Sequence, residues 1–354
     1  MAEEVEGPIG IAADEVESRL LGRPASMGRR EISRGAESSL VSARRFWHAL
    51  GFQIVEDEAM FTEADLEALQ AVSRLVRDFD VDEDLALGMT RALARTADRL
   101  AVWQTQLVAE SFMAPEEEAG LGEKDARAVT DVGVARQAAG RLVDLADELE
   151  PLMSYVWRRH LASAITRMLA DADDSHEPSA PPRVVGFADL VNFTSLVRRM
   201  TERQLANLVQ RFELLASDVV TTHGGRVIKT VGDEVLFVHT RPAAAAAIAL
   251  DLVDAMQEDL LMPPVRVGMA HGSVVSRLGD VFGVTVNRAS RLTSVTPSGR
   301  VFVDDELARR LGSVSGFRLT PGRRRSLRGI GLVTPFELHR SVGARRIDPS
   351  GHPV

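Results

Sequence analysis

Two aspartates in the second half of the chain stand where carboxylates could hold metal ions. Asp189 follows a short apolar segment at the point where a strand is expected to give way to a helix. Asp233 lies in a tight turn between two predicted strands, residues 226–231 and 234–239. Mg²⁺ and Mn²⁺ favour carboxylate and phosphate oxygens as ligands. Taken singly, either aspartate is more simply explained by the preference of this residue for turns and strand ends.

The segment after Asp189 has the form of a phosphate-binding loop. Phe193 and Thr194 lie at the predicted start of a helix, where the first backbone N–H groups lack a partner within the helix. Such groups can hold phosphate oxygens. We therefore expect phosphate to bind close to Asp189.

Lys229 and Asp280 could recognise a base. Lys229 lies four residues before Asp233, a spacing that puts both side chains on similar faces of a strand. Asp280 follows Gly279 in a predicted loop. The lysine could donate to a ring nitrogen of adenine, and the aspartate could accept from the exocyclic amine. The alternative is a surface charge pair of little energetic worth.

Asn287 and Arg291 are four residues apart and therefore lie on one face of a predicted helix. The planar guanidinium of an arginine makes bidentate contacts with phosphate, which suits the charge that builds up during phosphoryl transfer. The asparagine could hold a ribose. By itself, such a pair more often marks an exposed polar face of a helix.

These residues belong to a stretch in which strands and helices alternate. The predicted elements are a strand over 183–188, a helix with a capping box at Thr201–Gln204, the hairpin, an Ala-rich helix from Pro242 and a strand over 265–270. This order predicts a ferredoxin-like βαββαβ fold with further elements appended. Its first strand lies beside the hairpin, so Asp189 and Asp233 are expected to meet at one edge of the sheet.

The first half of the sequence predicts helices. Residues 82–109 place apolar side chains three and four apart, and Ser33 and Thr62 are predicted helix N-caps. A charged, Pro-rich segment is predicted to separate the halves as a linker. The predicted class is α+β, with an all-α regulatory domain ahead of the ferredoxin-like domain. The predicted boundaries are 1–170 for the helical domain, 171–182 for the linker, 183–342 for the α+β domain and 343–354 for a tail.

Composition excludes several classes of function. Cysteine is absent, which excludes disulfides, zinc–thiolate sites and thiol catalysis and agrees with a cytoplasmic location. The net charge of −9 repels nucleic acid and anionic lipid except at local patches, and Arg323–Arg325 is the longest basic run. The longest apolar run, 243–250, is too short to span a bilayer, and no signal-peptide pattern precedes it. We expect a soluble protein without a transmembrane segment that does not bind nucleic acid.

Taken together, three motifs resemble those of the class III nucleotidyl cyclases. They are Phe-x-Asp-Leu-x-x-Phe-Thr at 187–194, Lys-Thr-Val-Gly-Asp-Glu at 229–234 and Asp-Val-Phe-Gly-x-Thr-Val-Asn-x-Ala-Ser-Arg at 280–291. Their order and spacing are those of the family, and the segment over 327–339 resembles the family's last strands. The resemblance covers residues 183–340.

The resemblance implies an adenylyl cyclase, which forms 3′,5′-cyclic AMP and pyrophosphate from ATP with two Mg²⁺ or Mn²⁺ ions. By position, the metal ligands would be Asp189 and Asp233, the adenine-selecting pair Lys229 and Asp280, and the transition-state pair Asn287 and Arg291. In this family, the metal ligands come from one catalytic domain and the other four residues from a second. One chain that carries all six therefore implies a homodimer with two equivalent sites.

Segments of the first half resemble the helical N-terminal domain of soluble bacterial cyclases that restrain their own catalytic domain. The matching stretches are 44–52, 57–65 and 155–160. This resemblance implies autoinhibition, with pH or a fatty acid as the signal. His48 and His160 are candidate pH sensors because imidazole titrates near physiological pH. Packing or a surface position explains both histidines more simply.

Three other functions fit parts of the sequence. A diguanylate cyclase has a similar core, but residues 231–235 break its Gly-Gly-Asp-Glu-Phe signature at the first glycine and at the phenylalanine. Guanylyl cyclases usually carry Glu and Cys, or similar residues, at the positions of Lys229 and Asp280. A catalytically silent cyclase fold could sense a lipid or a proton for another partner. Such a protein would usually have lost a metal ligand or the arginine, and this sequence keeps them all.

Overall fold

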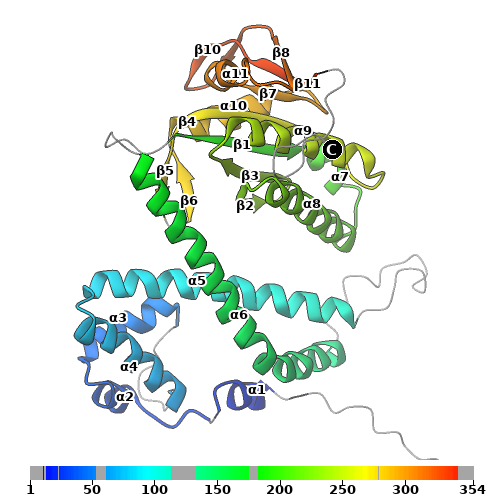
Figure 1. Cartoon of the computed structure of the whole chain (residues 1–354). Helices are drawn as coiled ribbons and strands as arrows, with labels where there is room; N and C mark the ends of the chain where they lie inside the picture. The colour runs from blue at the N-terminus through cyan, green and yellow to red at the C-terminus, as the bar shows by residue number, and fades with distance from the viewer. Residues whose placement is uncertain are drawn as a thin grey trace, which may run out of the picture. The chain divides into compact units, whose positions relative to one another are not determined.

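The chain folds into two units, Met1–Ala164 and Ile165–Val354. The computed structural model describes residues 11–52 apart from 12 and 23, residues 61–112 and 132–174, and residues 182–341 apart from 278. In this part of the chain the first unit is built of helices, and the second combines a sheet with helices (Figure 1). The predicted α+β class with a helical region ahead of it is confirmed.

The helices of the first unit follow capping signals in the sequence. Thr62 opens α4 (Glu63–Asp78) with a capping box, in which Thr62 Oγ1 accepts from Asp65 N at 3.3 Å and Thr62 N donates to Asp65 Oδ2 at 2.7 Å. The other helices are α1 (Ala13–Leu20), α2 (Arg29–Gly35), α3 (Leu40–Leu50), α5 (Glu83–Ser111) and α6 (Val132–Asp174), which from Ile165 onwards belongs to the second unit. None of the helices in the described residues is long and apolar enough to cross a bilayer.

Two helix ends differ from the sequence prediction. The prediction of Ser33 as an N-cap is wrong, because α2 begins at Arg29 and Ser33 is buried inside that helix. Helix α6 continues to Asp174, so residues 171–174 of the predicted linker are helical. The rest of that linker up to residue 181, the tail over 343–354, and residues 57–60 of the resembling segment lie outside the described residues.

The second unit is built on a seven-stranded sheet in the order β2-β3-β1-β4-β7-β11-β8. Its first four strands, with two helices, form the predicted ferredoxin-like core, in which β1 is antiparallel to both β3 and β4. The elements of this core are β1 (Pro182–Leu190), α8 (Glu202–Thr222), β2 (Arg226–Val231), β3 (Glu234–His239), α9 (Pro242–Glu258) and β4 (Val265–Ser273). The appended strands of the sheet are β7 (Val301–Val303), β8 (Phe317–Pro321) and β11 (Phe336–Arg340).

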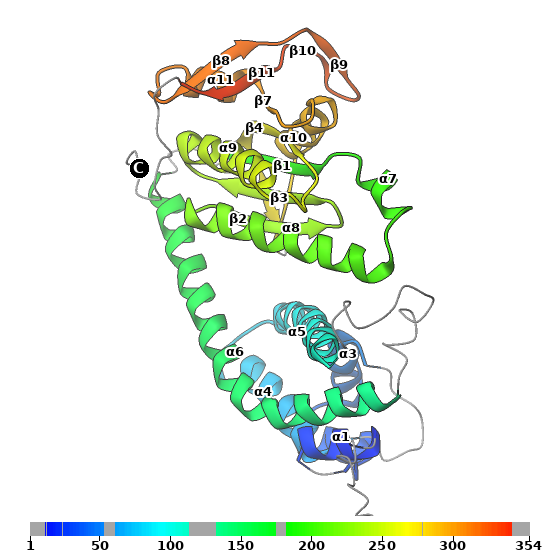
Figure 2. The same cartoon turned by 90° about the vertical axis from the view of Figure 1, so that its right-hand side faces the viewer.

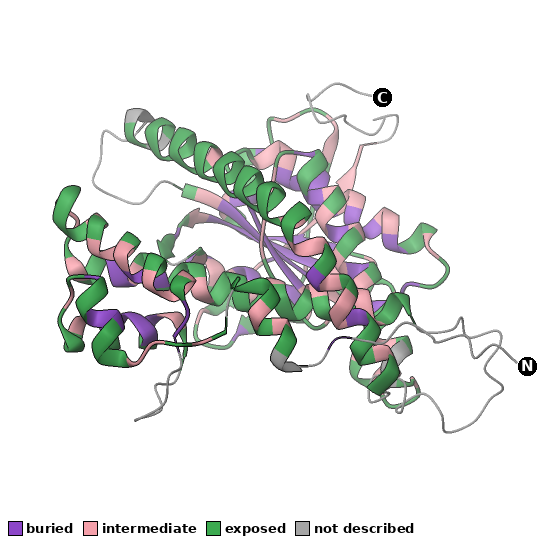
Figure 3. Ribbon diagram, turned by 90° about the horizontal axis from the view of Figure 1, so that it is seen from below, coloured by how far each residue is buried: buried purple, intermediate pink, exposed green. Residues whose placement is uncertain are grey.

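Helices cover both faces of this sheet (Figures 1 and 2). On one face, α8, α9 and α11 (Asp305–Leu311) pack against apolar side chains that include Val184 and Val267. On the other, α10 (Val284–Val295) packs against a separate cluster that includes Val185 and Ala270. We call this second side the α10 face. Figure 3 shows buried residues concentrated in the strands between the two layers.

Three smaller features complete the second unit. Strands β5 (Val275–Arg277) and β6 (Asp280–Phe282) form a hairpin that contacts α10 through β6. Strands β9 (Arg325–Leu327) and β10 (Gly331–Val333) form another hairpin. A short helix, α7 (Phe193–Val197), follows the end of β1.

Candidate active site

The strand ends on the α10 face gather charged side chains. Side chains alternate across a strand, and Val185 and Phe187 of β1 belong to the cluster beneath α10, so Asp189 is on that face too. The antiparallel register pairs Asp189 with Arg266 on β4 and with Glu234 on β3. Residues of three adjacent strands therefore lie side by side at this edge.

Asp189 and Asp233 meet at the same edge. Leu190 N donates to Asp233 O at 3.0 Å, which ties the tip of the β2–β3 hairpin to the end of β1. Burial raises the pKa of Asp233, and the charge of Asp189 raises it further. Burial also raises the pKa of Glu234, with added repulsion from Asp189 and Asp233. These carboxylates are close enough to disfavour one another's charge.

Arg266 balances the charge of Asp189, and the sequence motifs do not point to it. Its Nε donates to Asp189 Oδ2 at 2.6 Å, and its Nη2 lies 2.5 Å from the same oxygen. The Asp189 side chain is only 15% exposed, so the pair is partly desolvated. The one signal in the sequence is a charged residue within the apolar strand 265–270. Only the strand register shows that this residue faces Asp189.

The two aspartates fit a site for divalent cations. Both offer hard oxygen ligands, and a cation would relieve the repulsion that helps to raise the pKa of Asp233. Within the described ranges, no group of three or more His, Cys, Asp or Glu side chains is arranged to hold a metal ion. Two carboxylates leave coordination positions for phosphate oxygens and water, an arrangement typical of Mg²⁺ sites.

Lys229 and Asp280 form a direct ion pair between β2 and β6. Lys229 Nζ donates to Asp280 Oδ2 at 2.6 Å, and this hydrogen bond lowers the pKa of Asp280. Asp280 Oδ1 also accepts from Val281 N at 2.8 Å, which orients the carboxylate. The two side chains are 42% and 27% exposed, so a ligand can reach both. The structure thus brings together the pair that the sequence assigns to base recognition.

Asn287 and Arg291 are exposed on α10. No hydrogen bond or ion pair joins either side chain to another described residue. The helix that carries them lies tightly on the sheet, because a Cβ at Gly268 of β4 would lie 2.2 Å from Thr293 N. Both polar groups are therefore available to a ligand while their backbone is held in place.

Phe193 and Thr194 begin α7, as the sequence predicts. The residue before them, Asn192, has a left-handed backbone with φ +63°, which turns the chain out of β1. The ring of Phe193 packs against the main core of the second unit. The loop after Asp189 is thus anchored next to the paired carboxylates.

The two histidines proposed as pH sensors lie at the surface. His48 is exposed on α3 and accepts from Arg44 Nε at 3.4 Å. His160 is exposed on α6. Buried histidines occur instead in the second unit, at positions 223, 239 and 271. No local sequence pattern marks these three, since burial of a polar residue depends on packing between distant segments.

One pocket in the helical unit suits an anion with an apolar part. It has a volume of about 730 Å³ and is lined by four arginines, at positions 29, 44, 45 and 91, together with His48 and apolar side chains. Trp47 Nε1 and Ser33 Oγ are buried without a hydrogen-bond partner among the residues described, and both residues line the pocket. The arginines would attract a ligand with a negatively charged, hydrogen-bonding end.

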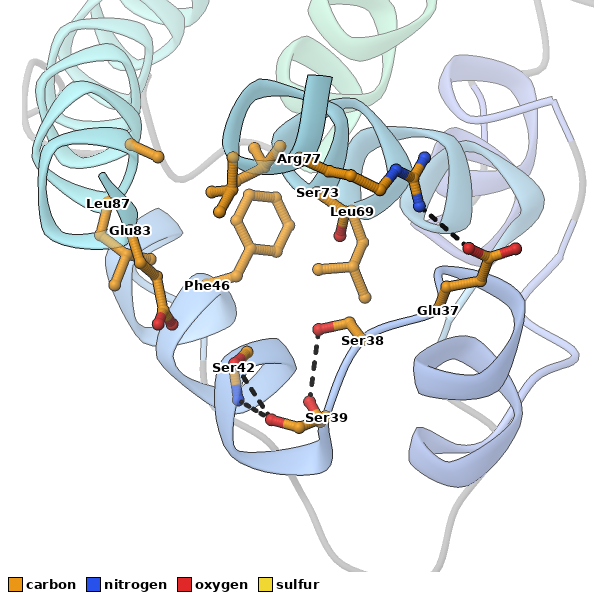
Figure 4. A pocket seen from close by; sticks show the side chains of 13 residues that line it. Glu37, Ser38, Ser39, Ser42, Phe46, Leu69, Ser73, Arg77, Glu83 and Leu87 are labelled. Carbon is orange, nitrogen blue, oxygen red and sulfur yellow. Dashed lines mark hydrogen bonds and ion pairs between the residues drawn. The ribbon is translucent and has the colours of Figure 1, made fainter. Parts of the chain in front are cut away.

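A smaller pocket, of about 270 Å³, lies between α3, α4 and α5 (Figure 4). Arg77 Nη1 contacts Glu37 Oε2 at 2.9 Å on one side of it, and Glu83 pairs with Arg45 at 3.1 Å on another. Its charged side chains are therefore already paired with one another or with their neighbours. The larger pocket has the greater excess of cationic side chains, because its described lining holds four arginines and no acidic residue, so it is the stronger candidate for an anionic ligand.

Comparisons with known proteins match both units. Residues 179–340 match the family described as the adenylate and guanylate cyclase catalytic domain. An adenylate cyclase of Glutamicibacter nicotianae is 39% identical over 97% of this chain and 89% of its own length. An adenylate cyclase of Streptomyces coelicolor is 37% identical over 96% of this chain and 91% of its own length. A pH-sensitive adenylate cyclase of Mycobacterium tuberculosis is 31% identical over 91% of this chain and 80% of its own length.

Proposed function

The chain belongs to the class III adenylyl cyclases, and from that premise we propose that it converts ATP to 3′,5′-cyclic AMP and pyrophosphate. The observation that carries this proposal is the meeting of Asp189 and Asp233 at one edge of the α10 face. Paired carboxylates beside a helix start are suited to a triphosphate with its divalent cations.

In the proposed reaction, the ribose 3′-oxygen attacks the α-phosphorus and pyrophosphate leaves from the opposite side. Asp189 and Asp233 would hold two Mg²⁺ or Mn²⁺ ions, which supply activation of the 3′-hydroxyl and neutralisation of the triphosphate. Arg291 would donate to the α-phosphate oxygens as their charge grows. Asn287 would orient the ribose, since positioning accounts for much of the catalysis in such a transfer.

Two further groups would hold the substrate. The amides at Phe193 and Thr194 would bind phosphate oxygens at the start of α7. Lys229 would donate to a ring nitrogen of adenine, while Asp280 accepts from the exocyclic amine. Their mutual ion pair of 2.6 Å supports this role because it holds a donor and an acceptor next to each other. Guanine offers the opposite hydrogen-bonding groups at these positions and would be disfavoured.

We further propose that two copies of the chain form a homodimer and share each site. Three large apolar side chains near the base-recognising and transition-state residues are exposed: Val231 at 61%, Phe282 at 50% and Val284 at 67%. A second copy would cover these side chains and bring its own Asp189 and Asp233 to the exposed Arg291. Exposed apolar side chains gathered at a site are a common sign of an interface.

The test is an assay of purified protein with ATP or GTP in the presence of Mn²⁺ or Mg²⁺. We expect cyclic AMP from the parent chain. The Asp233→Ala variant should lose at least about 100-fold in activity, because removing a transition-state metal ligand costs several kcal/mol. Cyclic GMP as the main product, or an Asp233→Ala variant as active as the parent, would overturn the assignment.

For the helical unit we propose regulation by an anionic lipid, such as a fatty acid, and by pH. The pocket with four arginines supports the first part, since guanidinium groups suit a carboxylate and the apolar wall suits a chain. His48 lines the same pocket, so its protonation would add a positive charge there. His160 remains a second proposed pH sensor.

Regulation is tested in the full-length chain. We expect oleate to bind and to change the rate of cyclic AMP formation, and Arg44→Ala with Arg91→Ala to weaken that binding at least about tenfold. Arg99→Ala, also on α5 but outside the pocket lining, is the control. His48→Gln and His160→Gln should each flatten the pH profile of activity. Unchanged oleate binding contradicts the lipid site, and unchanged profiles contradict the pH sensors.

A further inference from the structure

Arg288 lies between the proposed transition-state residues in the sequence of α10 but, unlike them, makes an ion pair. An α-helix turns by about 100° per residue, so Arg288 lies roughly 60° around the axis from Arg291. Asn287 and Arg291 are exposed, without side-chain partners in the described chain. Arg288 Nη1 instead donates to Asp304 Oδ2 at 3.1 Å. This is the one ion pair that α10 makes within the described residues.

Asp304 is a rigid anchor for that contact. It is 4% exposed and precedes α11, where Asp304 Oδ1 caps the helix by accepting from Leu307 N at 2.9 Å. The same oxygen accepts from His271 N of β4 at 3.2 Å, and Asp304 N donates to Met269 O at 3.0 Å. Contacts from both a strand and a helix thus fix the Asp304 carboxylate independently of Arg288.

The other contacts of α10 hold its inner face against the sheet, where Ala289, Leu292 and Thr293 are buried and Thr293 Oγ1 donates to Phe187 O at 3.4 Å. Gly268 sets how closely the helix approaches the sheet, and Thr285 Oγ1 donates to Ser273 O at 2.8 Å near its start. The N-cap, Gly283, offers no side-chain hydrogen bond. Arg288 leaves the flank of α10 and binds a buried carboxylate, so its ion pair resists rotation of the helix about the helix axis.

We propose that Arg288 is a positioning residue, whose ion pair with Asp304 adds to the packing of the inner face in fixing the rotation of α10 and so the directions of Asn287 and Arg291. The proposal rests on the proposed cyclase function, because it assigns those two side chains to the transition state. Neither side chain is held by another described residue, so the rotation of the helix sets the direction in which each one leaves the backbone. A rotated helix would leave both intact and misdirected.

This role predicts a specific kinetic change. Arg291 is proposed to act as charge builds in the transition state, whereas ATP is held by Lys229, Asp280 and the metal ligands. Loss of the anchor should therefore lower kcat by about 10–100-fold, while KM for ATP changes by less than about twofold. A merely structural role would instead lower the thermal midpoint and leave kcat per folded molecule unchanged.

The experiment compares Arg288→Met, Asp304→Asn and the double variant with the parent, using full-length protein, Mn²⁺ and ATP. Methionine keeps much of the length of Arg288 and removes the charge. Asparagine keeps acceptor capacity for Leu307 N and His271 N. If the pair acts as a unit, the double variant loses no more kcat than the worse single variant. Arg288→Lys, which keeps the charge, should recover part of the rate.

Arg310→Met is the matched control, because it breaks a 2.9 Å ion pair between Arg310 and Glu306 on α11 without touching α10. Its kcat should equal that of the parent. Should Asp304→Asn fail to fold, Arg288→Met decides alone, since the Arg288 side chain is 32% exposed. A folded Arg288→Met protein with parental kcat overturns the positioning role. A parent chain that forms no cyclic AMP overturns the proposed function instead.

Discussion

Arg266 and Asp189 lie opposite each other in the β1–β4 register, with Arg266 Nε 2.6 Å from Asp189 Oδ2. One of the two proposed metal ligands thus has a built-in cation beside it. The Arg266 guanidinium lowers the pKa of Asp233, whereas burial and the charge of Asp189 raise it. Arg266 therefore reduces the repulsion between carboxylates at this edge.

Removing the charge of Arg266 should make the stability of the protein depend more on added metal. In EDTA, Arg266→Gln should lower the thermal midpoint by about 2–4 °C, because the carboxylates lose their counter-ion. Mn²⁺ should then raise the midpoint of the variant more than that of the parent. Differential scanning fluorimetry measures both shifts.

Arg211→Gln is the control for Arg266→Gln. It breaks an ion pair of 2.5 Å with Asp259 that lies outside the candidate site. We expect its response to Mn²⁺ to match that of the parent. Equal Mn²⁺ shifts in the parent and in Arg266→Gln would show that Arg266 does not balance the metal ligands.

Lys229→Glu should weaken the recognition of adenine. The substitution replaces the donor at 2.6 Å from Asp280 with an acceptor and leaves two carboxylates facing each other. We expect kcat/KM for ATP to fall by about 10–100-fold, as for loss of a charged hydrogen bond. Combining it with Asp280→Cys should remove the repulsion and raise the ratio of cyclic GMP to cyclic AMP. Retention of the full ATP preference by the double variant would contradict base recognition by this pair.

Complementation should reveal the shared site. Asp189→Ala and Arg291→Ala chains should each be inactive, because each homodimer has the same defect in both sites. In a mixture, a heterodimer would contain one site with both defects and one intact site. Since about half of the dimers are mixed, activity should recover to about a quarter of the parental value. No recovery above the sum of the separate chains would rule out a shared site.

Acid should weaken the second unit through His239. Arg241 N donates to His239 Nδ1 at 2.7 Å, and His239 Nε2 lies 3.0 Å from His223 O. These partners suit the neutral ring, with Nδ1 accepting and Nε2 donating, and burial lowers the pKa of His239. The unfolded chain then binds more protons than the folded one below about pH 6.5, so stability falls as the pH falls through that value.

The measurement is the thermal midpoint between pH 7.5 and 5.5. On acidification, the thermal midpoint of His239→Gln should fall by about 3 °C less than that of the parent. His160→Gln, which changes an exposed histidine, should follow the parent. Parallel curves for His239→Gln and the parent would exclude this histidine as the source of acid sensitivity.

The sequence alone was sufficient for the features that depend on local pattern. The N-cap at Thr62 and the capping box at Thr201 form as predicted because they need only residues three positions apart. Strand and helix periods gave the order of the ferredoxin-like core, and that order places Asp189 next to Asp233. The family motif also named Lys229 and Asp280 as a pair, and the two side chains are in contact at 2.6 Å.

The tertiary structure decided which side chains from distant strands and helices meet. Nothing near Arg266 or Arg288 in the sequence indicates their carboxylate partners, which lie 77 and 16 residues away. Ser33 was also misjudged from the local sequence. Its residue type suits an N-cap, but it is a buried residue inside α2, which packs against its neighbours. The free energy from local helix or strand propensity is small compared with that from burying side chains. Burial depends on strand register and helix packing, which join segments far apart in the chain.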